Sequence, residues 1–239
     1  MGSLPPLLVR WLGSVPYSAA LTLQESLVAA RRRGEVPDHL LLLEHPPVIT
    51  LGRGSDPAHV LCSPEELSRR GVELHETGRG GDVTYHGPGQ LVGYPILAIP
   101  ESRRDAHRYL RDLEEVLSRT VAVHGIQAGR VEGPTGIWVG DEKLAAIGVR
   151  LSTGWITSHG FALNVDPDAE GFATIVPCGI RDRGVTSIRR LSGRTPRMRE
   201  VAATAAREFA RHFGLEPMLA DDPRERLAIP DDPGLSSST

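Results

Sequence analysis

The stretch RGGDVTYHGPGQ, from Arg79 to Gln90, is not explained by the needs of a fold alone, and we interpret the rest of the chain as organised around it. Its four glycines and one proline allow backbone conformations closed to other residues and a close approach to a ligand. The segment 83–85 between the glycine pairs favours a strand. A glycine-bounded hairpin turn is the simpler interpretation. The Arg, Asp, His and Gln within this one window favour a binding site instead.

The bulk composition is that of an ordinary globular protein. With 239 residues, 40% of them hydrophobic and 24% charged, the chain can form one large α/β domain or two small ones. A net charge of −3 and a pI near 6.3 give no electrostatic case for nucleic acid or an anionic membrane as partner. No apolar run approaches the ~20 residues that span a bilayer, and the N-terminus lacks the features of a signal peptide. Because two cysteines form no disulfide framework, we expect a cytoplasmic protein.

Hydrophobic periodicity and capping residues predict both helices and strands. The expected helices cover residues 15–33, 63–70, 105–124 and 195–213, the last capped by Thr195-Pro196. The expected strands cover residues 40–43, 48–51, 72–77, 91–99, 136–139, 143–151 and 155–165. Pro95 indicates that strand 91–99 is irregular or lies at an edge, and residues 166–184 show no pattern.

These elements predict an α/β protein, in the form of an α+β mixed sheet with helices packed on it. We expect a single catalytic domain over residues 1–216 and a C-terminal extension over residues 217–239. Residues 230–239, rich in Pro, Asp and Ser, are expected to be disordered because they have little to bury.

Two cysteines are candidate nucleophiles. Cys62 directly precedes a predicted helix, where a thiol can be reactive, although an inert buried cysteine is the commoner role. Cys178 lies between Pro177 and Gly179, in a restricted loop geometry that suits exposure to a ligand. By position alone, the inert and the functional interpretation of Cys178 are equally open.

A nucleophilic thiol needs an activating group, because at a pKa near ~8.5 only a few per cent is thiolate at neutral pH. The candidates are His45, His86, His159 and Lys143. A single His is more often a hydrogen-bonding core or surface residue, and a lysine is usually a solvated charge. Lys143, however, is the single lysine among 27 Lys and Arg residues. Coding bias toward arginine explains part of the scarcity of lysine. A need for a side chain that gives and takes a proton would explain why position 143 is still a lysine.

Several motifs together resemble one known family. The window RGGDVTYHGPGQLVGYP is preceded by EHPPVITLGR and followed by EKLAAIGVR, HGFALNV and VPCGI. These segments, between about residues 40 and 186, closely resemble the lipoyl(octanoyl) transferase family, the octanoyl-[acyl-carrier-protein]:protein N-octanoyltransferases. No motif position departs from the family pattern. Several motifs in the right order are far more specific than a single glycine loop.

The resemblance implies the fold of lipoate and biotin protein ligase catalytic domains and an acyltransferase with a Cys178/Lys143 catalytic pair. It implies octanoyl-acyl carrier protein as donor, and as acceptors the lipoyl domains of 2-oxoacid dehydrogenase E2 subunits and the glycine cleavage H protein. No cofactor or metal is expected, and the protein is expected to be a monomer. The substrate-binding residues that it implies are Arg79, Gly80, Gly81, Asp82, Val83, Thr84, Tyr85, His86, Ala146, Ile147, Gly148, Gly160, Phe161 and Ala162. His45, His159 and Asn164 are candidates for supporting the site.

The residue chemistry agrees with this implication. Lys143 as an ammonium near Cys178 would favour the thiolate that attacks a thioester, and N–H groups near Gly179 or Gly81 would stabilise the oxyanion. In its neutral form Lys143 would be the general base for the acceptor amine. This would be the first step of endogenous protein lipoylation and would need no ATP. At ~0.8 kcal/mol per CH₂, a dry tunnel lined by Val, Ile, Leu and Tyr85 would bind an eight-carbon chain.

Three alternatives remain at this level. An ATP-dependent lipoate or biotin ligase of the same fold needs no cysteine and commonly carries an accessory domain. A non-catalytic acyl-binding protein has no need of the Cys178/Lys143 pair. A zinc site from His159, Cys178 and a further His fits no standard spacing. The arginines between Arg181 and Arg194 form a candidate docking surface for an acidic carrier or lipoyl domain.

Overall fold

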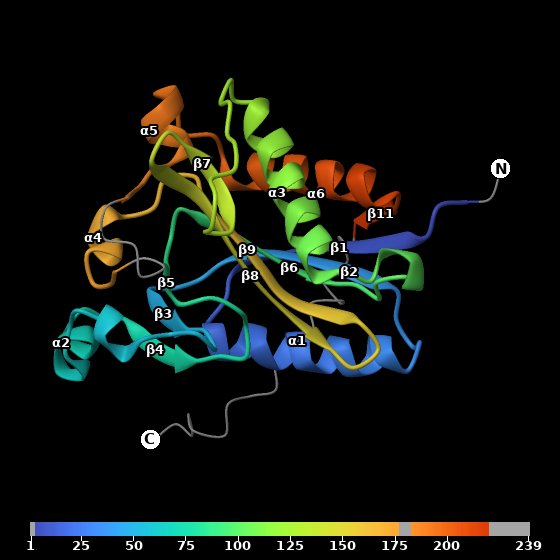
Figure 1. The fold of residues 1–239 in the computed structure, drawn as a ribbon, viewed down its shortest axis with the longest axis horizontal. Helices are drawn as coiled ribbons and strands as arrows, with labels where there is room; N and C mark the ends of the chain where they lie inside the picture. The colour runs from blue at the N-terminus through green and yellow to red at the C-terminus, as the bar shows by residue number, and fades with distance from the viewer. Residues whose placement is uncertain (1–2, 177–182, 220–239) are drawn as a thin grey trace, which may run out of the picture.

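A computed structural model describes residues 3–176 and 183–219 as a large sheet between helices, with a small sheet beside it (Figure 1). Within these residues the large sheet has eight strands in the order β10-β8-β9-β6-β2-β1-β11, and β7 pairs with β8. The strands are β1 (Pro6–Ser14), β2 (Asp38–Glu44), β6 (Gln90–Ile96), β7 (Gly136–Val139), β8 (Glu142–Ser152), β9 (Ile156–Asn164), β10 (Gly184–Val185) and β11 (Glu216–Leu219).

Both strand directions occur in this sheet. The pairs β1–β2, β1–β11 and β8–β10 are parallel, whereas β2–β6, β6–β9, β8–β9 and β7–β8 are antiparallel. The predicted mixed sheet is therefore confirmed. The small sheet has the order β4-β3-β5, with β3 (Val48–Leu51), β4 (Glu73–Glu76) and β5 (Val83–His86).

Strand β2 shows why the four consecutive leucines do not alternate with polar residues. Leu40 and Leu42 pack in the cluster that includes α3 (Ala106–Ala122) and α6 (Met198–Phe213). Leu41 and Leu43 point to the opposite face, where α1 (Tyr17–Arg32) lies. A strand that is buried on both faces has a continuous run of apolar residues in its sequence. Figure 1 shows α3 and α6 on one side of the sheet and α1 on the other.

The predicted helices form, and side chains cap two of them. Asp105 caps α3 by accepting a hydrogen bond from the Arg108 N–H, and Ser63 caps α2 (Pro64–Arg69) in the same way. The predicted cap of α6 was wrong. Its N-cap is Arg197, without a side-chain hydrogen bond, because the Thr195 hydroxyl instead donates to the Asp166 carboxylate.

The edge position expected from Pro95 was also wrong. Strand β6 lies between β2 and β9 in the middle of the sheet. Its pairing with β9 covers Gln90 to Gly93 and then stops, so Pro95 removes no donor from that ladder. The Thr157 hydroxyl bridges the gap by donating to the Pro95 carbonyl and accepting from the Leu97 N–H. The strand is therefore irregular, as the alternative expectation stated.

Sequence periodicity missed several short elements. Strand β1 and its partner β11 were not predicted, and β11 carries the sheet on to Leu219, past the expected boundary at residue 216. Between residues 166 and 184, where no pattern was visible, lie α4 (Ala169–Phe172) and the first residue of β10. The other short elements of the described residues are α5 (Ile188–Ser192) and the 3₁₀ turns η1 (Pro57–His59) and η2 (Glu101–Arg103). The expectation for residues 230–239 lies outside the described residues.

In the part of the chain described here, no helix has the length and apolar character needed to cross a membrane.

Candidate active site

A pocket lies where β5 of the small sheet faces β8 and β9 of the large one. It is partly open to solvent, and the space in and in front of it, open solvent included, amounts to about 520 Å³. Its lining comprises Tyr17, Arg79, Gly81, Asp82, Val83, Thr84, His86, Tyr94, Lys143, Ala146, Ile147, Gly148, His159, Gly160, Phe161 and Ala162.

The glycine-rich loop before β5 forms one wall and lies directly against β8. The Gly80 N–H donates to the Val149 carbonyl at 2.9 Å. A Cβ on Gly148 would lie 2.9 Å from the Gly80 carbonyl oxygen, so only glycine allows this approach. The buried Arg79 guanidinium donates to the Thr50 carbonyl at 2.6 Å and to the Gly80 carbonyl at 3.1 Å. The loop is thereby fixed to both sheets.

Lys143 faces this pocket because β8 carries a bulge. In the pairing with β7, Ala145 lies opposite Ile137 and Lys143 opposite Trp138, which leaves Leu144 as the extra residue. Leu144 and Ala145 both point into the core with α3, so the usual alternation shifts by one position. Lys143 therefore shares a face with Ala146, and both line the pocket. Bulges often re-aim a side chain at a functional site in this way.

The Lys143 side chain is buried against an aromatic ring. Its Nζ lies 4.8 Å from the ring centroid of Trp138 on β7, within the range of a cation–π contact. The Lys143 backbone is also held, because its carbonyl accepts a hydrogen bond from Thr186 N–H at 3.0 Å, directly after β10. Val185 of β10 lies opposite Lys143 in the sheet register.

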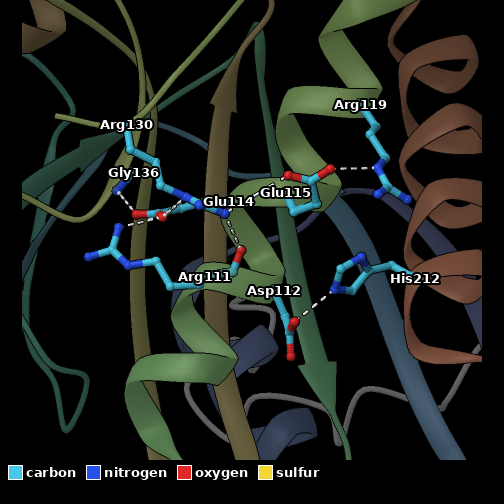
Figure 2. A network of polar contacts seen from close by, with 8 residues as sticks. All are labelled: Arg111, Asp112, Glu114, Glu115, Arg119, Arg130, Gly136 and His212. Carbon is cyan, nitrogen blue, oxygen red and sulfur yellow. Dashed lines mark hydrogen bonds and ion pairs between the residues drawn. The ribbon is translucent and has the colours of Figure 1, made fainter.

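The start of β7 is fixed by a buried carboxylate on α3. Glu114 is fully buried, and its Oε1 accepts from the Gly136 N–H at 3.0 Å. Its Oε2 pairs with the Arg111 guanidinium at 2.6 Å and with that of Arg130 at 2.7 Å. Figure 2 shows Glu114 between the two arginines, next to Gly136. This places the strand that carries Trp138.

Three histidines lie buried at and behind the pocket, and their neutral form is favoured. Burial lowers the pKa of His86 to about 3 and those of His45 and His159 to about 4. His45 lies behind the lining, where its Nε2 bonds the Tyr94 hydroxyl at 2.7 Å and its Nδ1 bonds the Val15 carbonyl. His159 has a left-handed backbone, φ 55°, and its N–H donates to Gln24 of α1.

The pocket brings together twelve of the fourteen expected substrate-binding residues, along with Lys143 and His159. Tyr85 is not among them: side chains alternate along β5, so Thr84 and His86 face the pocket while Tyr85 packs on Phe172 of α4. Gly80 contributes a backbone contact but does not line the pocket. Asn164 lines a smaller adjoining hollow, which also contacts Lys143.

Sequence reasoning missed two residues of the lining, Tyr17 and Tyr94. Tyr94 lies in β6, at the end of the motif RGGDVTYHGPGQLVGYP, and its place in that motif was the one available signal. Tyr17 begins α1, outside every motif. Tyr17 had no such signal, because only the tertiary fold brings it to the pocket.

The two cysteines differ in what can be described. Cys178 lies outside the described residues, and so does the start of the arginine cluster at Arg181. Cys62 is half-buried and packs on the small-sheet core with α2. Across residues 3–176 and 183–219, no three His, Cys, Asp or Glu side chains are grouped to hold a metal ion.

Comparison with known proteins identifies the family. The profile of the lipoyl protein ligase A/B catalytic domain matches residues 16–210. An octanoyltransferase of Chloroflexus aurantiacus is 51% identical over 215 residues, which cover 89% of this chain and 96% of that protein. The chain belongs to the octanoyltransferase family. An octanoyltransferase of Rubrobacter xylanophilus is 55% identical over 186 residues, covering 77% of this chain and 83% of the relative. The enzyme is therefore an acyltransferase.

Solved structures confirm the predicted fold of this family member. A lipoate-protein ligase A bound with ATP aligns with a TM-score of 0.67 at 16% identity, covering 92% of this chain and 89% of that one. A Thermoplasma acidophilum protein with bound lipoic acid gives a TM-score of 0.72, also at 16% identity, covering 92% and 89%. The biotin protein ligase of Aquifex aeolicus, with biotin and ATP, gives 0.54 at 16% identity over 85% of this chain and 69% of that one. At these identities the likeness concerns the fold alone.

Proposed function

We propose that this enzyme transfers an octanoyl group from acyl carrier protein to a lysine of a lipoyl domain, through a thioester on Cys178. The observation that carries the proposal is the pocket between the two sheets with a buried lysine on its wall. Cys178 precedes β10 by a few residues, and β10 pairs with β8 at Lys143. This connection supports the assignment of Cys178 and Lys143 as the catalytic pair.

In the first half-reaction, the Cys178 sulfur attacks the thioester carbonyl of the donor. The new C–S bond forms as the bond to the carrier thiol breaks, and the cysteine proton passes to the departing thiol through Lys143. An ammonium at Lys143 favours the attacking thiolate.

In the second half-reaction, the acceptor lysine attacks the acyl-enzyme as a neutral amine. A C–N bond forms, the bond to Cys178 breaks, and neutral Lys143 carries the amine proton to the cysteine sulfur. A thioester is exchanged for an amide, so no ATP is consumed. The donor and acceptor steps therefore use the same lysine in opposite protonation states.

We assign the acyl chain to the face of β8 and β9 between Lys143 and Gly148. Ala146 and Ala162 lie opposite each other there and leave room for a chain. At ~3.3 Å per strand residue, this face is roughly 13 Å long once the bulged residue is discounted. Each CH₂ removed from water contributes ~0.8 kcal/mol.

We further propose that the acceptors are lipoyl domains of 2-oxoacid dehydrogenase E2 subunits and of the glycine cleavage H protein, and that a monomer acts in the cytoplasm. Arg189 and Arg190 of α5 support docking of an acidic partner, since their side chains are 63% and 65% exposed. Each already pairs with a local carboxylate, Asp166 or Glu142. Docking would use the outward part of both guanidinium groups.

The test is intact mass spectrometry after mixing the enzyme with octanoyl-acyl carrier protein, without ATP. We expect an octanoyl adduct that hydroxylamine removes on the wild-type enzyme. We expect no adduct on Cys178→Ser. In Lys143→Ala the adduct should form at least 100-fold more slowly. Transfer that appears only when ATP and free octanoate are supplied would instead favour a ligase.

A further inference from the structure

A line of side-chain hydrogen bonds runs behind the pocket wall, from β5 to the end of β10. His86 Nδ1 lies 2.6 Å from Gln90 Oε1, and Gln90 Nε2 lies 2.9 Å from Asn164 Oδ1. Asn164 Nδ2 lies 3.0 Å from the carbonyl oxygen of Thr186. The three side chains are buried, so water does not replace these contacts. Only one end, the His86 ring, belongs to the pocket lining.

The Thr186 end of this line fixes the direction of every hydrogen bond in it. The Thr186 carbonyl can only accept, so Asn164 must donate its NH₂ there and accept with its oxygen. The Asn164 oxygen accepts from the Gln90 NH₂ group, which also lies 3.4 Å from the Tyr85 carbonyl oxygen. The Gln90 oxygen is left to accept, and the remaining donor is His86 Nδ1–H.

The consequence is a fixed tautomer of His86. With the proton on Nδ1, the other ring nitrogen, Nε2, carries the lone pair of a ring that lines the pocket. Burial, the neighbouring His45 ring at 5.7 Å and the Arg79 charge all disfavour a second proton. His159 acts in the same direction. The ring is thus a hydrogen-bond acceptor and a poor base.

A hydrogen-bond acceptor that lines a substrate pocket favours the substrate group that brings it a donor. The octanoyl chain and the thioester group itself, in the donor and in the acyl-enzyme, have no N–H or O–H group to offer. The acceptor lysine amine, which enters in the second half-reaction, has two N–H groups. The two half-reactions therefore differ in whether the reacting group brings a hydrogen-bond donor to His86 Nε2.

We propose that His86 Nε2 accepts a hydrogen bond from the attacking lysine amine, and that Gln90 and Asn164 are positioning residues that hold His86 in the required tautomer. With one N–H bonded to His86, the amine lone pair is directed at the thioester carbonyl. The amine proton that leaves on C–N bond formation goes to Lys143, not to His86. The proposal rests on the proposed function, because it concerns the acceptor step.

The kinetic test measures the two half-reactions separately by intact mass. Acyl-enzyme is first formed with octanoyl-acyl carrier protein, then mixed with a lipoyl domain. In His86→Phe we expect acceptor transfer to slow by about 10- to 100-fold, with acyl-enzyme formation changed less than about 3-fold. Gln90→Met should slow the same step by a smaller factor. Without the Gln90 oxygen as acceptor, part of the His86 population carries its ring proton on Nε2, which then cannot accept from the amine.

The matched control is His39→Gln. His39 is a buried histidine whose ring bonds the Pro37 carbonyl at the start of β2, away from the pocket lining. It should leave both half-reactions unchanged. Equal slowing of both half-reactions in His86→Phe, or slowing of acyl-enzyme formation alone, would overturn the assignment to the amine.

A second test needs no turnover and uses the folded wild type. Nitrogen-15 NMR of His86 should show the proton on Nδ1, and octanamide, an N–H donor, should shift the Nε2 resonance. Methyl octanoate, of similar shape but without a donor, should bind without that shift. A proton found on Nε2, or equal shifts with both ligands, would overturn the proposal. Failure of both ligands to bind would contradict the proposed acyl pocket instead, while the tautomer would still test the hydrogen-bond line.

Discussion

At the scale of single residues, the Trp138 ring lies against Lys143, the proposed catalytic lysine. It is buried, lies 4.8 Å from Lys143 Nζ and does not line the pocket. Trp138→Leu removes the ring that stabilises the ammonium, a contact worth up to about 2 kcal/mol in a desolvated site. We expect acyl-enzyme formation to slow by about 10- to 30-fold with little change in KM for the donor. Rapid mixing, quenching and intact mass spectrometry measure this rate.

Rescue and a buried-ring control separate this effect from loss of stability. Trp138→Phe keeps a ring and should recover part of the rate. Tyr109→Leu removes another buried ring, in the α3 core cluster, and should lower the melting temperature without changing the rate. A Trp138→Leu enzyme as fast as wild type would show that the ring does not act through Lys143.

Tyr17 provides a second prediction at this scale, about acyl-chain length. It lines the pocket from the start of α1 and packs on the rings of His45 and His75. Tyr17→Ala should open space for additional methylenes, each worth ~0.8 kcal/mol. The ratio of decanoyl to octanoyl transfer should therefore rise by about 10-fold in competition assays with both donors. An unchanged ratio would mean that the acyl chain does not reach Tyr17.

The residue scale also shows how far the sequence could lead. Lys143 could be singled out because it is the only lysine in the sequence, and the glycine window because its composition serves no core. The exclusion of Tyr85 was predictable only once β5 was known to begin at Val83, since a shift of one residue reverses the faces of a strand. Tyr17 reaches the pocket through tertiary packing, which has no local signal.

At the scale of secondary-structure elements, Glu114 joins α3 to β7. It bonds Gly136 N–H and two arginines while fully buried. Glu114→Ala leaves a buried N–H without its acceptor and removes two charge-assisted contacts, whose arginines are half-exposed and can be hydrated. We expect a loss of about 2–3 kcal/mol in the free energy of unfolding, measured by urea denaturation. Glu115→Ala is the control, because its contacts lie on the surface of the same helix and should contribute below about 1 kcal/mol.

Elements with strong periodicity were predicted from sequence and those without it were not. Helix α3 repeats its apolar residues at helical spacing and carries an Asp cap, and both signals are local. Strands β1 and β11 are far apart in sequence and stabilise each other by parallel pairing, which no window of residues records. The edge position predicted from Pro95 was wrong for a local reason. Proline is excluded from a central strand only where its missing N–H would belong to a hydrogen-bond ladder, and the ladder between β6 and β9 ends at Gly93, before Pro95.

At the scale of the whole molecule, the buried histidines make stability depend on pH. Burial lowers the pKa of His86 to about 3 and those of His45 and His159 to about 4, against 6.5 when unfolded. Below pH 6.5 the unfolded chain therefore binds protons that the native state does not, so stability is present above pH 6.5 and is lost as the pH falls toward 4. Each group contributes a slope approaching about 1.4 kcal/mol per pH unit.

Urea denaturation between pH 5 and 7.5 measures this slope. His45→Gln removes one titrating group that does not line the pocket and should reduce the slope by about one proton. A stability that stays constant from pH 7.5 to 5 would contradict the neutral, buried state of these rings.

Leu144 gives β8 a dependence on strand length that substitution experiments do not reveal. Its side chain is one more leucine in the core, and exchange for another aliphatic residue keeps the count of residues along the strand. Deleting it would remove the bulge and leave Lys143 and Ala146 two positions apart, so strict alternation would keep both on the side they now share. Inserting one further residue next to the bulge would instead turn Lys143 to the opposite face. The orientation of the Lys143 amine thus depends on the number of residues that separate it from Ala146, and a single-codon insertion could silence the enzyme without altering any group of the proposed site.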